Sequence, residues 1–318
     1  MAQDTPKNKC IVLTGPTAVG KTRLSIALAK ALDAEIMSAD SMQVYRGMDI
    51  GTDKIKIEAM EGVPHHMIDV LDATEPFNVY RFRQMASEVM EGIYARGHIP
   101  LIVGGTGFYI QAVLYDIDFN AEDDDAFRKE LEAYVKEGGE RALEELHKRL
   151  RAVDPDAADA IHKNNVKRVI RALSFYHETG FMISAHNASE RQKESPYAFH
   201  YFVLTDDRAV LYERINARVD QMMEDGLVEE VRRLMEAGVT RDMTSMQGLG
   251  YREIYAYLSG EYDLPRAAEK IKQGSRHFAK RQLTWFHREK NVTWIDKRDY
   301  DRDDKIILQA MLRMIDEG

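Results

Sequence analysis

Several features are scarce in this chain of 318 residues, and each scarcity excludes a class of protein. A lone cysteine, Cys10, excludes an internal disulfide and a cysteine zinc cluster, which fits a reducing compartment. No apolar run approaches the roughly eighteen residues that a membrane span requires. The segment from Met1 to Lys9 is polar, so we expect no secretion signal and a cytoplasmic location.

An excess of positive charge is lacking too, because the formal net charge is −9. Taken alone, this charge weighs mildly against a protein that binds nucleic acids, unless basic side chains gather locally. What the chain does contain is 31% charged residues and short, interrupted apolar segments, which are typical of a globular protein.

Short apolar segments alternate with helical patterns over most of the chain. The predicted strands are Cys10–Thr14, Glu35–Ser38, Pro100–Val103, His200–Leu204 and Val292–Ile295. Such alternation predicts an α/β fold in which helices cover both faces of a parallel sheet.

The stretch from about residue 123 to about residue 196 departs from this pattern. It contains no convincing strand. Amphipathic helices are predicted around Phe127–Val135, Leu143–Leu150 and Val166–Leu173, and Asp154-Pro155 is typical of a helix start. We therefore expect an all-helical domain, residues 121–197, inserted into an α/β core of residues 1–120 and 198–318. A single continuous domain with a long crossover is the alternative.

The most informative motif follows the first predicted strand and precedes a helical pattern. It matches G-x-x-x-x-G-K-[ST] and consists of Gly15, Pro16, Thr17, Ala18, Val19, Gly20, Lys21 and Thr22. Strand, glycine loop and helix form the context of a phosphate-binding loop, whose backbone N–H groups and helix dipole bind anions. Lys21 would reach a phosphate oxygen, and Thr22 would hold Mg²⁺. The motif predicts a P-loop NTPase-like core and a di- or triphosphate ligand, without specifying a reaction.

Two further strand ends carry candidate chemistry. Asp40 follows the second predicted strand, so it would lie beside the phosphate-binding loop as a general base, a metal ligand or merely a turn cap. The third predicted strand is followed by Gly104 and Gly105, where a typical P-loop hydrolase has an acidic residue that supports the attacking water. This missing acid argues against nucleotide hydrolysis. Thr106 comes next and offers a hydroxyl.

Basic residues gather in three places despite the acidic total. Arg214 and Arg218 lie one helical turn apart and could bind a polyphosphate. Residues 163–171 contain four cations and no acid, and residues 276–288 interleave cations with aromatics. Such interleaving is typical of RNA recognition, although solvated helix faces would give the same pattern.

Together these segments resemble the bacterial tRNA dimethylallyltransferase family, also called the IPP transferase family. The resemblance covers about residues 10–296 and rests on the phosphate-binding loop, Ser38–Tyr45, Gly47–Thr52, Val103–Thr106, Gly248–Arg252 and Lys280–Trp285. It implies transfer of a dimethylallyl group from dimethylallyl diphosphate to N6 of the adenosine immediately 3′ of the anticodon, in tRNAs that read codons beginning with U. The phosphate-binding loop would then hold the diphosphate of the donor and not a nucleotide.

The resemblance also implies roles for individual residues. Asp40 would be the general base, with Thr106 and Arg218 as the other catalytic residues and Mg²⁺ on Thr22. Contacts to the tRNA anticodon stem-loop would come from Asp40, Ser41, Met42, Gln43, Thr106, Arg128, Lys167, Arg168, Val169, Ile170, Arg171, Gln247, Gly248, Leu249, Gly250, Tyr251, Arg252, Lys280, Arg281, Gln282, Leu283, Thr284, Trp285, Phe286 and His287. No membrane and no obligate protein partner are expected, and the protein would be a monomer.

Three other functions stay open from the residues. A small-molecule P-loop kinase would share the loop and the arginine-bearing helix, but it does not explain the aromatic and basic segment near the C-terminus. An adenylate dimethylallyltransferase would share Asp40 and the donor site, but it has little use for a basic insertion. A nucleotide-regulated RNA-binding protein without catalysis does not explain the Asp40 segment or the paired glycines.

Overall fold

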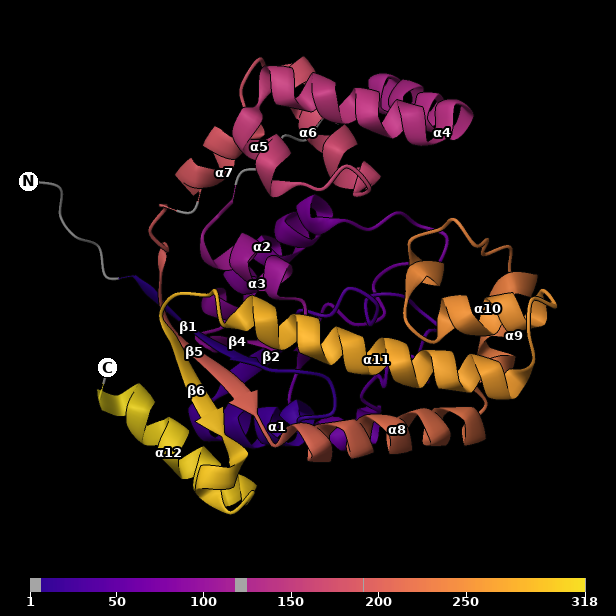
Figure 1. Cartoon of the computed structure of the whole chain (residues 1–318). Helices are drawn as coiled ribbons and strands as arrows, with labels where there is room; N and C mark the ends of the chain where they lie inside the picture. Colours follow the sequence, from indigo (N-terminus) through magenta and orange to yellow (C-terminus); the bar gives the residue numbers. More distant parts are fainter. Residues whose placement is uncertain (1–6, 118–124, 191, 318) are drawn as a thin grey trace, which may run out of the picture. The chain divides into compact units, whose positions relative to one another are not determined.

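A computed structural model describes residues 7–117, 125–190 and 192–317 of the chain (Figure 1). Contacts between Cα atoms divide the chain into two compact units, one of residues 1–116 and 196–318 and the other of residues 117–195. The larger unit has two hydrophobic cores, and the smaller unit has a separate one. The domain boundary predicted at residue 120 lies outside the described residues.

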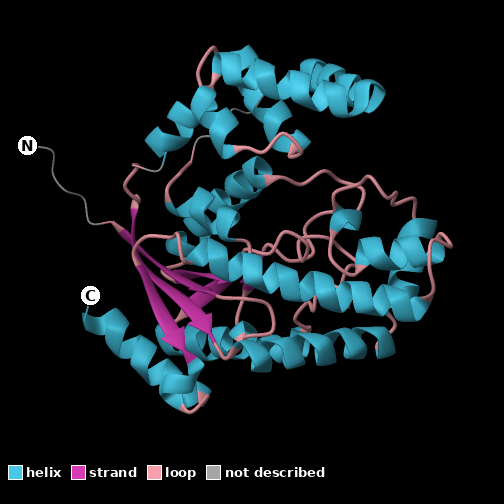
Figure 2. Cartoon of the chain, viewed as in Figure 1, coloured by secondary structure: helices cyan, strands magenta, loops and turns pink. Residues whose placement is uncertain are grey.

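The larger unit is built around a six-stranded sheet in the order β3-β2-β4-β1-β5-β6. Figure 2 shows the strands of this sheet in magenta. Every neighbouring pair is parallel, which confirms the predicted fold class. The strands are β1 (Asn8–Thr14), β2 (Ala34–Ser38), β3 (His65–His66), β4 (Ile99–Gly104), β5 (Tyr197–Thr205) and β6 (Val292–Asp296). Sequence analysis missed only β3 among these strands, because two residues are too short for an alternating pattern.

Helices cover both faces of this sheet, as the alternating pattern predicts. Val12 and Ile102 belong to the core shared with α2, α3 and α11, whereas Leu13 and Leu101 belong to the core shared with α1 and α12. The helices of this unit are α1 (Lys21–Leu32), α2 (Val79–Ala95), α3 (Gly107–Leu114), α8 (Arg208–Glu224), α9 (Leu227–Glu236), α10 (Tyr251–Leu258), α11 (Leu264–Phe286) and α12 (Asp304–Glu317), with short 3₁₀ turns at Ile57–Met60, Ser245–Gln247 and Lys297–Tyr300.

All regular secondary structure in the described residues of the smaller unit is helical. This unit contains α4 (Asp125–Val153), α5 (Pro155–Ala160), α6 (Val166–Thr179) and α7 (Ile183–Glu190). The two helices predicted before Asp154 are both parts of α4, which is interrupted at Gly139 where φ is 55°. Asp154 caps α5 as predicted, because its carboxylate accepts a 3.0 Å hydrogen bond from the Ala157 N–H. No helix within the described part of the chain is long and apolar enough to cross a membrane.

Candidate active site

The phosphate-binding loop connects the end of β1 to the start of α1. Its backbone has a positive φ at Gly15, Ala18 and Gly20, so successive N–H groups can turn toward one side of the loop. A side chain at Gly15 would collide with the backbone carbonyl of Leu204 on β5, which explains why glycine is needed there. Lys21 and the exposed Thr22 form the first turn of α1, where the helix dipole favours an anion.

Lys21 lies near three other charged side chains, those of Arg218, Asp40 and Asp53. Its ammonium donates hydrogen bonds of 2.9 Å to the carbonyl oxygens of Gly15 and Pro16. Burial lowers the pKa of Lys21 to about 8, and the nearby Arg218 contributes in the same direction, whereas Asp40 and Asp53 oppose it. The loop therefore holds a cation whose charge is sensitive to the charges around it.

Arg218 of α8 reaches the phosphate-binding loop, and Arg214 does not. The Arg218 Nη1 donates a 3.0 Å hydrogen bond to the hydroxyl of Thr17 and lies 3.3 Å from the Asp53 carboxylate. Arg214 is instead 3.1 Å from the buried carboxylate of Asp206. Of the two arginines that the helical spacing singled out, Arg218 is thus the one available to a phosphate group.

Asp40 lies just beyond the end of β2. Its Oδ1 accepts hydrogen bonds from the N–H groups of Met42 and Gln43, at 2.8 and 3.4 Å. The turn-cap alternative is therefore correct for one oxygen, but the residue also lines a cavity. The cap and the functional interpretation are compatible, because a carboxylate has two oxygens.

The loop after β4 lies against the Asp40 segment. The Thr106 N–H donates a 3.3 Å hydrogen bond to the carbonyl of Ala39. A side chain at Gly104 would collide with the backbone of Ala39, so glycine permits this close approach. The hydroxyl of Thr14 donates a 2.6 Å hydrogen bond to the Gly104 carbonyl, which ties the same loop to β1.

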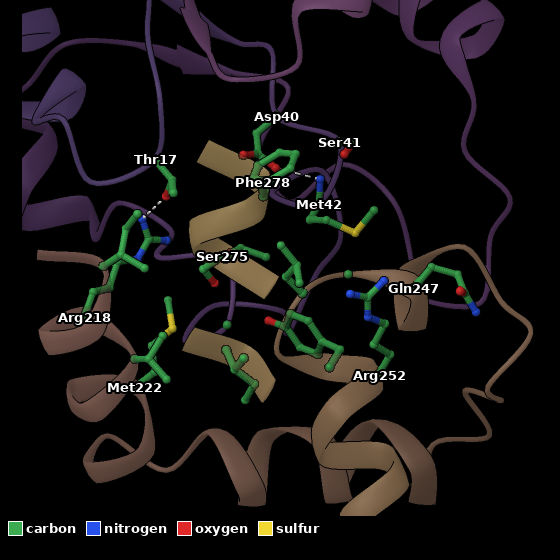
Figure 3. A pocket seen from close by; sticks show the side chains of 18 of the residues that line it. Thr17, Asp40, Ser41, Met42, Arg218, Met222, Gln247, Arg252, Ser275 and Phe278 are labelled. Carbon is green, nitrogen blue, oxygen red and sulfur yellow. Dashed lines mark hydrogen bonds between the residues drawn. The ribbon is translucent and has the colours of Figure 1, made fainter. Parts of the chain in front are cut away.

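These elements surround one cavity of about 270 Å³ within the larger unit (Figure 3). Its polar lining includes Thr17, Asp40, Thr106 and Arg218, and its apolar wall includes Ile215, Val219 and Met222, which share one face of α8. The rest of the lining consists of Ser41, Met42, Gly51, Thr52, Gln247, Gly248, Leu249, Tyr251, Arg252, Ile271, Ser275, Phe278 and Arg281. The structure therefore brings the predicted base, threonine and arginine to one space.

Part of the predicted RNA-contact set is buried in this structure. The side chains of Val169, Ile170, Tyr251, Gln282 and Phe286 are at most 5% exposed. Helical periodicity explains this burial, because a helix that presents Lys280, Arg281, Thr284 and His287 to solvent turns Gln282 and Phe286 inward. Similarly, Lys167, Arg168 and Arg171 of α6 are exposed, whereas Val169 and Ile170 belong to the core of the helical unit.

Glu230 of α9 supports the cavity wall, and sequence analysis missed it. Its carboxylate, 1% exposed, accepts hydrogen bonds from the N–H groups of Asp49, Ile50 and Gly51, and from the Tyr251 hydroxyl at 2.6 Å. Gly51 and Tyr251 both line the cavity. The burial of Glu230 could have been predicted from the sequence, because position 230 lies on the helix face that carries Leu227 and Leu234.

Comparison with known proteins identifies the family. The family model described as IPP transferase matches residues 43–289, and a second, described as isopentenyl transferase, matches residues 8–70. The chain belongs to the IPP transferase family. It is 54% identical over 308 residues to the tRNA dimethylallyltransferase of Lachnoclostridium phytofermentans, with 96% of this chain and 97% of that protein covered.

Two solved structures are also similar to this member of the IPP transferase family. The full-length tRNA isopentenylpyrophosphate transferase of Bacillus halodurans matches with a TM-score of 0.72 and 46% identity, over 98% of each chain. A eukaryotic dimethylallyltransferase acting on tRNA matches with a TM-score of 0.81 and 28% identity, over 96% of this chain and 78% of that chain. The predicted family and the predicted enzyme class, a prenyltransferase, are thereby confirmed.

Proposed function

We propose that this chain is a tRNA dimethylallyltransferase. It transfers the dimethylallyl group of dimethylallyl diphosphate to N6 of the adenosine immediately 3′ of the anticodon, in tRNAs that read codons beginning with U. The observation that carries this proposal is the cavity itself, in which Thr17 and Arg218 of a phosphate site share one space with the carboxylate of Asp40. The names of the relatives support the same reaction.

The donor binds at the phosphate-binding loop. Backbone N–H groups of the phosphate-binding loop, together with Lys21 and Arg218, hold its diphosphate, which is also the leaving group. As the allylic C–O bond breaks, its electron pair moves onto the diphosphate, and these cations stabilise the negative charge where it develops. The apolar side chains of Ile215, Val219 and Met222 suit the five-carbon chain of the donor.

The acceptor adenine enters the same cavity beside Asp40. Its exocyclic amino group is a weak nucleophile, because the lone pair is delocalised into the ring. As N6 forms a bond to the allylic carbon, one N6 proton passes to Asp40. Since Oδ1 is occupied by the two backbone N–H groups, we assign Oδ2 as the proton acceptor. Thr106 supplies a hydroxyl at the cavity wall, where it assists near the adenine or the scissile oxygen.

Mg²⁺ fits this site as a partner of the diphosphate. The described residues contain no cluster of three or more metal-binding side chains, so a metal here would take most of its ligands from phosphate and water. Thr22, exposed on the first turn of α1, would hold it by its hydroxyl. The ion would supply further positive charge at the leaving group.

RNA binds over the basic residues around the cavity and on the helical unit. Arg252 and Arg281 line the cavity, and Lys280 is exposed beside them on α11. Lys167, Arg168 and Arg171 form an exposed basic face on α6, without an acidic partner among the described residues, and we assign them to the anticodon stem-loop. The target base must leave its stack, at a cost of roughly a few kcal/mol, which these contacts offset. The protein acts as a monomer.

One assay tests the proposed reaction. Purified protein with Mg²⁺ and labelled dimethylallyl diphosphate should transfer label to unmodified tRNA. Turnover of AMP without turnover of tRNA would instead indicate an adenylate dimethylallyltransferase. Consumption of ATP that does not require the prenyl donor would indicate a small-molecule kinase and would overturn the proposal.

A further inference from the structure

A buried amide side chain joins the two halves of the candidate active site. Gln282 of α11 is 5% exposed. Its Oε1 accepts a 2.9 Å hydrogen bond from the Thr17 N–H, and its Nε2 donates a 3.0 Å hydrogen bond to the Gly105 carbonyl. The orientation of this amide is determined by its partners, because the Thr17 N–H can only donate and the Gly105 carbonyl can only accept.

The two partners of Gln282 lie in two different loops, and each loop contributes a residue to the cavity wall. Thr17 belongs to the phosphate-binding loop, and its hydroxyl accepts the 3.0 Å hydrogen bond from Arg218. Gly105 is followed by Thr106, whose N–H donates to the carbonyl of Ala39, the residue before Asp40. One amide is therefore connected to the diphosphate side and to the base side of the site.

Two glycines in the loop after β4 leave room for side chains of α11. A Cβ atom on Gly105 would collide with the Nε2 of Gln282, so the amide fills the space that glycine leaves. One turn further along α11, the Trp285 ring occupies the corresponding space at Gly107. The face of α11 that carries Gln282 and Trp285 thus packs directly on the glycine loop.

We propose that Gln282 is a positioning residue for prenyl transfer, holding the phosphate-binding loop and the Gly104–Gly107 loop at the separation that the reaction needs. This inference rests on the proposed function. Gln282 is buried, whereas the exposed residues on either side of it, Lys280, Arg281 and Thr284, remain candidates for RNA contact. The distance between the donor carbon and the adenine is set by these two loops, and a displacement of about 1 Å can cost about 100-fold in rate.

The first test separates positioning from RNA binding. Gln282→Leu keeps the approximate size of the side chain but removes both hydrogen bonds. We expect kcat to fall by about 100-fold at saturating tRNA and donor, with the Kd for tRNA unchanged within about twofold. Gln273→Leu is the matched control, because Gln273 is an exposed glutamine on the same helix, and it should behave as the wild type. Weakened tRNA binding with a normal kcat, or no change in either quantity, would overturn the inference.

Gln282→Glu provides a readout that a general loss of packing would not give. An ionised glutamate still accepts from the Thr17 N–H, but it faces the Gly105 carbonyl without a proton to donate. Protonation restores the donor, and burial raises the pKa of a carboxyl group, so the activity of Gln282→Glu relative to wild type should rise as the pH falls. The relative activity of Gln282→Leu should not change with pH. A pH-independent ratio for Gln282→Glu would contradict the assigned hydrogen bonds.

Amide hydrogen exchange tests the same contacts without an activity assay. The Thr17 N–H is bonded to Gln282, so exchange in peptides covering residues 15–22 should be faster in Gln282→Leu than in wild type or Gln273→Leu. Unchanged exchange in a folded Gln282→Leu would overturn the positioning role. If the wild-type protein fails to prenylate tRNA but exchange is still faster in Gln282→Leu than in wild type, the proposed function is overturned and the loop contact stands.

Discussion

The guanidinium of Arg218 donates a 3.0 Å hydrogen bond to the hydroxyl of Thr17, so α8 and the phosphate-binding loop meet at one point of the cavity. The same guanidinium lies 3.3 Å from the carboxylate of Asp53. Arg218 is thus held beside an anionic group and beside the backbone of a loop built to bind anions. A diphosphate bound at this loop would bring its negative charge within reach of Arg218.

We expect Arg218→Gln to lower kcat/KM for dimethylallyl diphosphate by about 100- to 1,000-fold, which is typical of removing one group that stabilises developing charge. Steady-state kinetics with tRNA in excess measure this effect. Arg208→Gln is the control, because Arg208 is exposed near the start of the same helix. Equal kinetics for the two variants would remove Arg218 from the donor site.

Asp40→Asn tests the base. Asparagine retains an oxygen that can accept from the Met42 N–H, so the turn should be preserved. The loss of the proton acceptor should lower kcat by about 100- to 10,000-fold while tRNA binding stays nearly intact. Single-turnover rates and a filter-binding Kd give the two quantities separately. A large loss of tRNA affinity with near-normal turnover would contradict the assignment.

The charge of Lys21 predicts a pH dependence. Because the pKa of Lys21 is lowered to about 8, the free enzyme loses this positive charge as the pH rises through that value. We therefore expect kcat/KM for the donor to decline above about pH 8. Arg218 contributes to the lowering, so Arg218→Gln should move this decline to higher pH. A decline at the same pH in both proteins would assign it to another group.

The strands and the phosphate-binding loop could be predicted because their signals are local. An apolar run followed by Gly15–Thr22 determines strand, loop and helix together, and the structure has this order as β1, loop and α1. The two-residue β3 and the joining of two predicted helices into α4 had no such signal. Their lengths depend on packing between segments that are distant in the sequence.

The residues around the cavity were predictable to different degrees. Asp40 and Thr106 follow strands, so parallel-sheet topology brings them to one edge. Gln282 and Glu230 lie within helices, where only the partner loops reveal their roles. A motif that contained Gln282 suggested RNA contact for the whole segment, but a single helix cannot turn every residue toward the same partner.

Glu230 makes a prediction about stability. Glu230→Ala would leave the N–H groups of Asp49, Ile50 and Gly51 and the Tyr251 hydroxyl without their acceptor in a buried site. We expect a loss of about 3 kcal/mol in the free energy of unfolding, measured by urea titration. The neighbouring Glu229→Ala is the control, because Glu229 is exposed, and its effect should stay within about 0.5 kcal/mol. Similar losses for both variants would argue against the buried network as the cause.

The salt dependence of tRNA binding tests the basic residues of α11. Lys280 and Arg281 are exposed, and Arg281 also lines the cavity. Each phosphate contact contributes about 0.7 to 0.9 to the slope of log K against log salt, so removing both cations should reduce the slope by roughly 1.5. The double variant Lys280→Ala/Arg281→Ala should therefore bind tRNA more weakly at low salt and approach the wild type at high salt.

Matched charge removal on α12 is the control for this experiment. Lys305 and Arg313 are also exposed, so Lys305→Ala/Arg313→Ala changes the net charge by the same amount at a distant helix. If the slope reflects contacts at α11, only the first double variant should lower it. Equal slopes in the two double variants would mean that the total charge, and not the position of Lys280 and Arg281, determines the response to salt.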